Sequence, residues 1–148
     1  MHSANSVIIQ ASRERIFDTV SDLGRWPEQL PHYRYVKFLG QDGGRDIVAM
    51  SARRGWLPVS WVSAYVANRE TLEMHFEHLR KWTKGMAVTW TLTPTGDGTK
   101  VEIVHTMKFR VPWLAWFAEP IIGGFIMAIA NKTLAVFKQQ IEAGEGAA

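Results

Sequence analysis

Between Tyr33 and Phe109 the apolar residues alternate with polar ones, and this period of two constrains the fold more than any other feature of the chain. It predicts six strands, over Tyr33–Leu39, Asp46–Arg53, Pro58–Ala67, Thr71–His78, Met86–Thr93 and Lys100–Phe109. The connections are short and rich in turn-forming residues, as in the Pro-Thr-Gly-Asp-Gly stretch of residues 94–98. Because short connections join antiparallel neighbours, the pattern predicts a meander.

The two ends of the chain add the remaining elements. Ser6–Gln10 is expected to be a further strand, Ala11–Ser21 a helix capped by Ser12, and Leu23–Leu30 a short second helix. After Pro112 the apolar residues fall on one side of a long helix that ends near Gly144, followed by a frayed tail. The expected fold is therefore a single α+β domain over residues 1–148, with a seven-stranded curved antiparallel sheet around a C-terminal helix. A single helix covers such a sheet only partly, which leaves a cavity.

Composition and charge exclude several classes of protein. The chain of 148 residues is 47% hydrophobic, which is typical of a folded soluble domain, and it has no cysteine for a disulfide or a thiolate metal site. His75 and His78 lie on opposite faces of their predicted strand and cannot share a metal, so we expect neither metal nor cofactor. The net charge of +3 comes from scattered basic residues, which does not favour a nucleic-acid partner.

One segment approaches the length of a membrane span. Residues Val111–Ala130 are nearly all apolar, but Pro112, Pro120 and the Gly123–Gly124 pair weaken a spanning helix. The one-sided apolar pattern also continues beyond the segment, as in a helix that packs on a core. Because Met1–Gln10 also lacks the pattern of a signal peptide, we expect a cytoplasmic protein.

The period of two also predicts which side chains face the cavity. It places Phe76, Met86, Trp90 and Met107 on the inner faces of their strands, together with His105. For His105 two interpretations stay open, namely a histidine of the core that bonds to a neighbour, or a polar or acid–base group of the site. In the strand that contains Trp61 and Tyr65 both faces are rather apolar, so the pattern alone does not assign them.

Several short motifs resemble one known family. They are Phe17-Asp18-Thr19-Val20-Ser21-Asp22, Trp26-Pro27-Glu28 with Tyr33 seven positions after Trp26, Trp61-Val62-Ser63, Gly85-Met86 followed by Trp90, and Gly98-Thr99-Lys100-Val101. Over nearly its whole length the chain resembles the polyketide cyclase/dehydrase branch of the START-like (SRPBCC) superfamily, and in particular the tetracenomycin-type aromatase/cyclases. The resemblance implies the helix-grip fold.

The resemblance also implies roles for some residues. In the aromatase/cyclases, a pocket folds a poly-β-ketone chain and promotes aldol closure with dehydration, with a tyrosine and an arginine as the polar groups. The tyrosine corresponds to Tyr33, and the pocket walls to Trp61, Met86 and Trp90. At the position of the arginine this chain has Tyr65, which donates a hydrogen bond but carries no permanent charge. Arg53 could supply the missing cation if it faces inward.

Three functions follow as hypotheses. The first is a protein that binds an apolar or aromatic small molecule without catalysis, and the second is a cyclase or dehydratase that uses Tyr33 or His105 as an acid–base group. The third is a lipid- or quinone-binding protein at a membrane surface, suggested by a predicted apolar loop over Pro112–Phe117. The loop is alternatively a lid over the cavity. The loss of the arginine favours binding, and the sequence leaves monomer and homodimer open.

Overall fold

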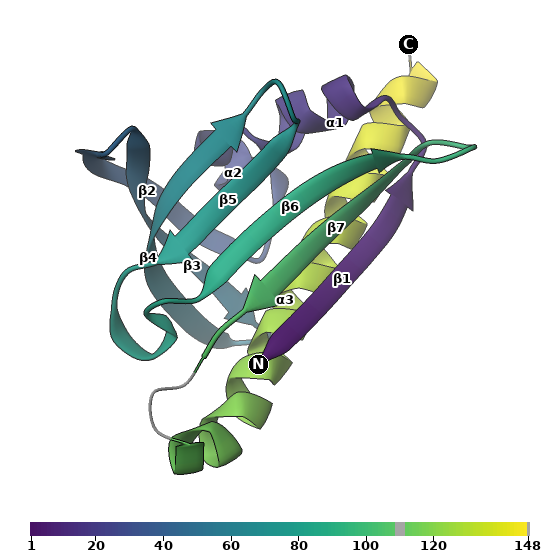
Figure 1. Cartoon of the computed structure of the whole chain (residues 1–148). Coiled ribbons are helices and arrows are strands. Elements are labelled where there is room, and N and C mark those ends of the chain that lie inside the picture. The colour runs from purple at the N-terminus through teal and green to yellow at the C-terminus, as the bar shows by residue number, and fades with distance from the viewer. Residues whose placement is uncertain (109–111, 148) are drawn as a thin grey trace.

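The structure, a computed structural model, describes residues 1–108 and 112–147 and contains one antiparallel sheet and one long helix (Figure 1). The strands are β1 (His2–Ile9), β2 (Tyr33–Asp42), β3 (Arg45–Arg54), β4 (Leu57–Asn68), β5 (Glu73–His78), β6 (Ala87–Pro94) and β7 (Thr99–Thr106). The helical elements are α1 (Arg13–Val20), η1 (Leu23–Arg25), α2 (Trp26–Gln29), η2 (Lys81–Thr83) and α3 (Pro112–Ala147).

The sheet has the strand order β1-β7-β6-β5-β4-β3-β2, so the predicted seven-stranded antiparallel sheet is confirmed. Strands β2 to β7 form the meander, and β1 pairs with β7 from His2 opposite Thr106 to Ile9 opposite Thr99. β1 therefore begins four residues before its predicted start, because its backbone groups continue to find partners along β7. Phe109, the predicted end of the last strand, lies outside the described residues.

The curvature of the sheet has a local cause in β2. The register between β2 and β3 shifts between Tyr33 and Tyr35 and again between Phe38 and Gly40. Each shift puts an extra residue into one strand, which bends the strand and increases its twist. In Figure 1 the sheet curls around α3, and this concave face is where a cavity can form.

The two short helices after β1 are present as predicted. The Ser12 side chain accepts a hydrogen bond of 3.2 Å from the Arg15 backbone N–H and caps α1, whose buried residues are Ile16, Phe17 and Val20. The predicted second helix is divided into η1 and α2. Pro27 lies in the first turn of α2, where a proline is well tolerated. Helices α1 and α2 lie at the same end of the sheet (Figure 1).

The long helix α3 begins earlier and ends later than expected. The predicted loop over Pro112–Phe117 is wrong, because these residues form the first turns of α3, and proline is well tolerated at the start of a helix. The helix continues past the predicted end near Gly144 to Ala147. Pro120 lies inside the helix without ending it.

The two halves of α3 have different surroundings. The second half lies on the sheet and buries Ala130, Thr133, Leu134, Phe137 and Ile141, whereas large side chains of the first half are exposed. By length and composition alone, residues Trp116–Gly144 would suffice to cross a membrane. The burial of the second half shows that this part of the helix serves as the core helix of the domain.

Aromatic side chains form the centre of the core. The ring of Trp26 lies 5.7 Å from that of Trp90 and 5.8 Å from that of Phe137, measured between centroids. The Trp26 indole N–H donates a hydrogen bond of 2.9 Å to the Val20 carbonyl, so the polar atom of this buried side chain is satisfied. The cluster joins α2, β6 and α3.

Candidate functional site

A cavity of about 490 Å³ lies between the concave face of the sheet and α3. Its lining residues are Trp26, Tyr33, Met50, Val59, Ser60, Trp61, Phe76, His78, Lys81, Thr83, Met86, Val88, Trp90, Ile103, His105, Ala118, Ile121, Ile122, Phe125, Ile126, Ile129, Ala130 and Thr133. A volume of this size suits an ordinary small-molecule ligand, and most of the lining is aliphatic or aromatic.

The cavity brings together most of the residues predicted for a site. Tyr33, Trp61, Phe76, Met86, Trp90 and His105 all line it. They come from strands β2, β4, β5, β6 and β7 and from the connection before β6, so the cavity is assembled across nearly the whole sheet. The inner faces derived from the period of two hold for β5, β6 and β7, where Met74, Val88 and Ile103 are buried as well.

Three predicted residues lie elsewhere. The Tyr65 ring is buried, but its hydroxyl donates a hydrogen bond of 2.8 Å to the Ser21 carbonyl, away from the cavity. Met107 is buried beyond the end of β7, and Arg53 is exposed, and neither is among the lining residues. Arg53 has the wrong parity, because Ala52 next to it is buried on the inner face.

Sequence reasoning missed Arg54, which contacts a residue of the cavity lining. Its guanidinium carbon lies 5.5 Å from the centroid of the Phe125 ring, and Phe125 lines the cavity. This contact is a cation–π interaction between β3 and α3. The alternation of Met50, Ala52 and Arg54 on one face of the strand was a signal that could have identified it.

His78 is the second residue that sequence reasoning did not assign to the site. Its Nδ1 lies 2.8 Å from the Thr83 hydroxyl, and its ring is parallel to that of Trp61, with centroids 5.9 Å apart. Burial lowers the pKa of His78 to about 4, with a further contribution from His105. The imidazole is therefore neutral at pH 7 and forms part of an uncharged wall.

Of the described residues that line the cavity, His105 is the one with a buried side-chain polar atom that has no hydrogen-bond partner. Its Nδ1 is buried and makes no hydrogen bond within the described residues. Burial lowers the pKa of His105 to about 4, so this ring is also neutral at pH 7. A buried polar atom without a partner is costly, which makes Nδ1 a natural contact for a polar group on a ligand.

A small polar cluster of Tyr33, His32 and Thr133 lies beside the cavity, and Tyr33 and Thr133 belong to the cavity lining. The Thr133 hydroxyl donates a hydrogen bond of 2.7 Å to the Ile129 carbonyl and lies 2.8 Å from Nε2 of His32. Because the Thr133 hydrogen is used in this way, Nε2 of His32 is the donor to Thr133. Burial lowers the pKa of His32 to about 4 and raises that of Tyr33, so both are neutral at pH 7.

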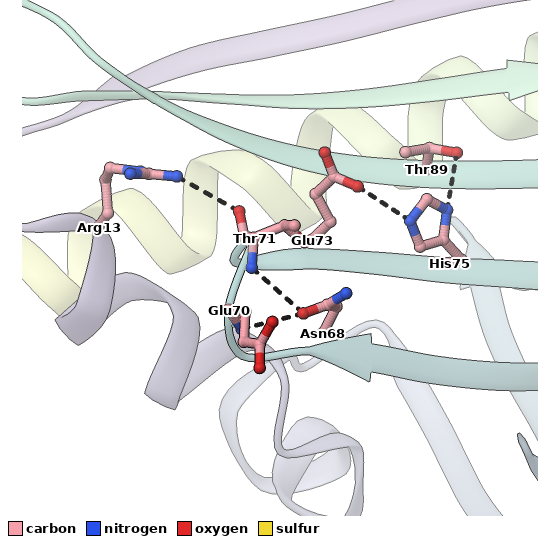
Figure 2. A network of polar contacts seen from close by, with 7 residues as sticks. All are labelled: Arg13, Asn68, Glu70, Thr71, Glu73, His75 and Thr89. Carbon is pink, nitrogen blue, oxygen red and sulfur yellow. Dashed lines mark hydrogen bonds and ion pairs between the residues drawn. The ribbon is translucent and has the colours of Figure 1, made fainter. Parts of the chain in front are cut away.

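The described residues contain no group of three or more potential metal ligands. His75 lies on the outer face of the sheet, where Nε2 is 3.1 Å from a Glu73 carboxylate oxygen and Nδ1 is 3.4 Å from the Thr89 hydroxyl (Figure 2). The nearby side chain of Asn68 closes the β4–β5 turn by accepting hydrogen bonds from two backbone N–H groups. This network stabilises the turn and is separate from the cavity.

The electrostatics of the cavity restrict its chemistry. In the part of the chain that the structure describes, Lys81 is the one lining residue with a permanent charge, and its side chain is exposed. Tyr33 and the two neutral imidazoles of His78 and His105 supply hydrogen-bonding groups inside aromatic walls. Such a site can bind an uncharged apolar molecule and orient it through one or two hydrogen bonds.

Known structures share this fold. The aromatase/cyclase Zhui of Streptomyces sp. R1128 superposes with a TM-score of 0.81 at 12% identity, covering 96% of this chain and 93% of that protein. A START superfamily protein of Mycobacterium smegmatis superposes with a TM-score of 0.69 at 17% identity, covering 94% of this chain and 98% of that one. The helix-grip fold of the START-like superfamily, implied by the sequence motifs, is thereby confirmed.

Sequence comparison gives the family. A Streptomyces cyaneus protein that carries the name polyketide cyclase is 26% identical over 107 residues, which cover 68% of this chain and 68% of that protein. The family model described as polyketide cyclase/dehydrase and lipid transport matches residues 1–142. Because this match spans almost the whole sequence, the chain belongs to the polyketide cyclase/dehydrase and lipid transport family.

Proposed function

We propose that this protein binds an apolar, partly aromatic small molecule in its cavity and does so without catalysing its conversion. The observation that supports this proposal above all others is the cavity of about 490 Å³, whose walls are aromatic and whose described lining residues include no buried charge. A polyketide, a lipid or a quinone-like molecule has the required apolar body. A cytoplasmic location and the oligomeric state, monomer or homodimer, stay predictions.

The partnerless Nδ1 of His105 narrows the class of ligand. A neutral imidazole nitrogen can accept or donate one hydrogen bond, according to its tautomer. A hydroxyl or carbonyl group on the ligand would satisfy this atom, and the gain would be large because the atom is buried. The favoured ligand therefore has one hydrogen-bonding group on an otherwise apolar framework.

Filling the cavity tests the proposal. Ala130 lines the cavity and is 5% exposed, so Ala130→Trp places an indole in the space that a ligand would use. Native mass spectrometry of protein purified from its own host should show a bound small molecule in the unaltered protein. The fraction of protein that carries this molecule should be about 100-fold lower for Ala130→Trp, because the ligand loses most of its contact area.

Ala135→Trp is the matched control, because Ala135 lies on the exposed side of the same helix. It should retain the bound molecule, and thermal melting of both variants confirms that each is folded. A protein that repeatedly carries nothing and binds no member of a panel of aromatic polyketides, fatty acids and quinones would contradict the proposal. Equal retention in both tryptophan variants would place the ligand elsewhere.

The neutral histidines predict the pH dependence of binding. Because the pKa values of His78 and His105 are both about 4, we expect the affinity for the co-purified molecule to be constant from pH 8 to about pH 5. Below about pH 4 the affinity should fall by up to about tenfold per pH unit for each of the two rings, as protonation puts a charge into the apolar site. Isothermal titration calorimetry across this range measures the effect. A loss of affinity centred near pH 6.5 would show that the rings are solvated.

A cyclase is the second candidate function, and one observation favours it. A neutral imidazole with a free nitrogen in a buried cavity is able to accept a proton from a bound ketide, and Tyr33 can donate one. No arginine is among the described lining residues to stabilise an enolate, which is why binding is the first proposal.

A minimal polyketide synthase tests catalysis directly. If the protein is a cyclase, adding it should change the product spectrum seen by liquid chromatography, and both Tyr33→Phe and His105→Gln should reverse the change. A spectrum that the unaltered protein leaves as it was would exclude catalysis on that class of chain. The Ala130→Trp experiment tests ligand binding whether or not the protein also catalyses a reaction.

A further inference from the structure

The first half of α3 carries large apolar side chains that the described part of the molecule leaves uncovered. Trp113, Trp116, Phe117 and Ile121 are 66%, 75%, 59% and 64% exposed, and we call them the apolar cluster. The Trp116 and Phe117 ring centroids are 4.9 Å apart, and those of Trp113 and Phe117 are 6.5 Å apart. Scattered exposed apolar residues are ordinary, but a contiguous group of this kind marks an interaction surface.

The apolar cluster lies beside the mouth of the cavity. Ile121 belongs both to the exposed cluster and to the cavity lining, so the cavity opens next to it. Lys81 of η2 is likewise exposed and part of the lining. Figure 1 shows the β5–β6 connection, which contains η2, at the same end of the molecule as the first turns of α3. Helix and connection therefore form two sides of the mouth.

A third element at the mouth is the turn between β3 and β4. Arg54 lies against the Phe125 ring of α3, which places the turn beside the helix. The turn carries Trp56, whose side chain is 87% exposed, the highest value among the exposed large apolar residues. A fully exposed tryptophan gains nothing in water, but its ring with a polar N–H suits the boundary between apolar and aqueous phases.

Exposed basic residues occur in the elements at the mouth of the cavity. Five exposed basic residues come from the end of β3 and from the β5–β6 connection, and we call them the basic rim: Arg53, Arg54, Arg80, Lys81 and Lys84. In the first half of α3, residues 112–130, the sequence has a single charged residue, Glu119. The Glu119 carboxylate lies 3.9 Å from the terminal ammonium group of Met1, so the rim keeps a net positive charge.

We propose that this end of the molecule docks on the surface of an anionic lipid bilayer. Tryptophan and phenylalanine side chains enter the interfacial layer, where aromatic residues concentrate in membrane proteins. Lysine and arginine of the basic rim contact the anionic headgroups. Docking in this orientation brings the mouth of the cavity against the lipid, so an apolar ligand can pass without crossing water.

Charge argues against a second copy of the chain as the occupant. A two-fold symmetric contact through this end would place the basic rim of one copy against that of the other. Like charges opposed in this way cost free energy and slow association, whereas an anionic surface attracts them. The lipid surface therefore satisfies both the apolar cluster and the basic rim.

Vesicle flotation tests the apolar contribution. The unaltered protein should float with vesicles of phosphatidylcholine and phosphatidylglycerol, and its partition coefficient should fall at least about tenfold in Trp113→Ala/Trp116→Ala. The matched control is Phe38→Ala/Leu39→Ala, which removes similarly exposed side chains (54% and 53%) from the edge strand β2. The control should float like the unaltered protein.

The charge contribution is tested separately. Arg53→Glu/Arg80→Glu should lose the preference for phosphatidylglycerol over pure phosphatidylcholine vesicles, and raised salt should have the same effect on the unaltered protein. The control Lys37→Glu/Arg69→Glu makes the same change in net charge at exposed residues away from the mouth. It should keep most of the preference.

Three results would overturn the proposal. One is the absence of flotation with either vesicle, and another is flotation that the tryptophan substitutions leave unchanged. The third is a dimer by analytical ultracentrifugation that Trp113→Ala/Trp116→Ala converts to monomer without any vesicle binding, since the cluster would then be an interface. Ala130→Trp, which blocks the cavity, should still float, so docking and ligand binding can fail independently.

Discussion

Replacing Phe137 by alanine should lower the free energy of unfolding by about 3–5 kcal/mol, as is usual for a fully buried phenylalanine. The side chain is 0% exposed and contacts the rings of Trp26 and Trp90, with centroids 5.8 Å and 6.3 Å away. These aromatic neighbours cannot collapse into the space without leaving their own contacts. Urea denaturation measures the change, and the melting temperature should fall by about 10 °C.

Phe117→Ala provides the control on the same helix. Phe117 is 59% exposed, so its removal should change the free energy of unfolding by less than about 0.5 kcal/mol. A comparable loss of stability in both variants would mean that the two halves of α3 do not differ in packing. The pair of measurements therefore tests the division of the helix into a core half and an exposed half.

Stability should also fall steeply in mild acid. The pKa values of His32, His78 and His105 are lowered to about 4 in the folded state, against about 6.5 in an unfolded chain. Between these values the unfolded state binds more protons, so the stability is complete above pH 6.5 and decreases as the pH falls toward 4. Each histidine contributes a slope of up to about 1.4 kcal/mol per pH unit.

Denaturation curves at about pH 7.5, 6 and 5 measure the slope, because the first value lies above the window and the other two lie inside it. His78→Gln/His105→Gln should remove about two thirds of it, because two of the three buried histidines are gone. His75→Gln, which changes an exposed histidine on the outer face of the sheet, is measured beside it as the matched substitution. A slope that the double variant does not reduce would assign the acid sensitivity to other groups.

The fold was predictable because two periods dominate the chain. Alternation from Tyr33 onward gave the strands, their antiparallel order and the inner faces of β5 to β7, and one-sided helical spacing gave the second half of α3. The start of α3 was mistaken for a loop because the apolar residues of 112–121 surround the helix without favouring one face. A helix end that nothing covers leaves no one-sided pattern to detect.

The cavity residues were predictable by face but not by depth. Tyr65 was assigned to the site by the family resemblance and not by the strand pattern, and it lies where β4 approaches Ser21, so its hydroxyl finds a backbone partner there. The alternation of apolar and polar residues predicts which side chains share a face of the strand, but it does not predict where along the strand the cavity lies. Arg53 was predicted to face the cavity, but it lies on the opposite face of β3, and its neighbour Arg54 shares the face of the buried residues Met50 and Ala52.

The pairing of β1 with β7 has a consequence for how the protein is made. His2 pairs with Thr106, and so β1 must wait for about one hundred further residues to be synthesised before its partner strand exists. The helix α3, which covers the concave face, is synthesised after all seven strands of the sheet. During synthesis the strand edge and the apolar face are both open, which is the state in which nascent chains aggregate or recruit chaperones.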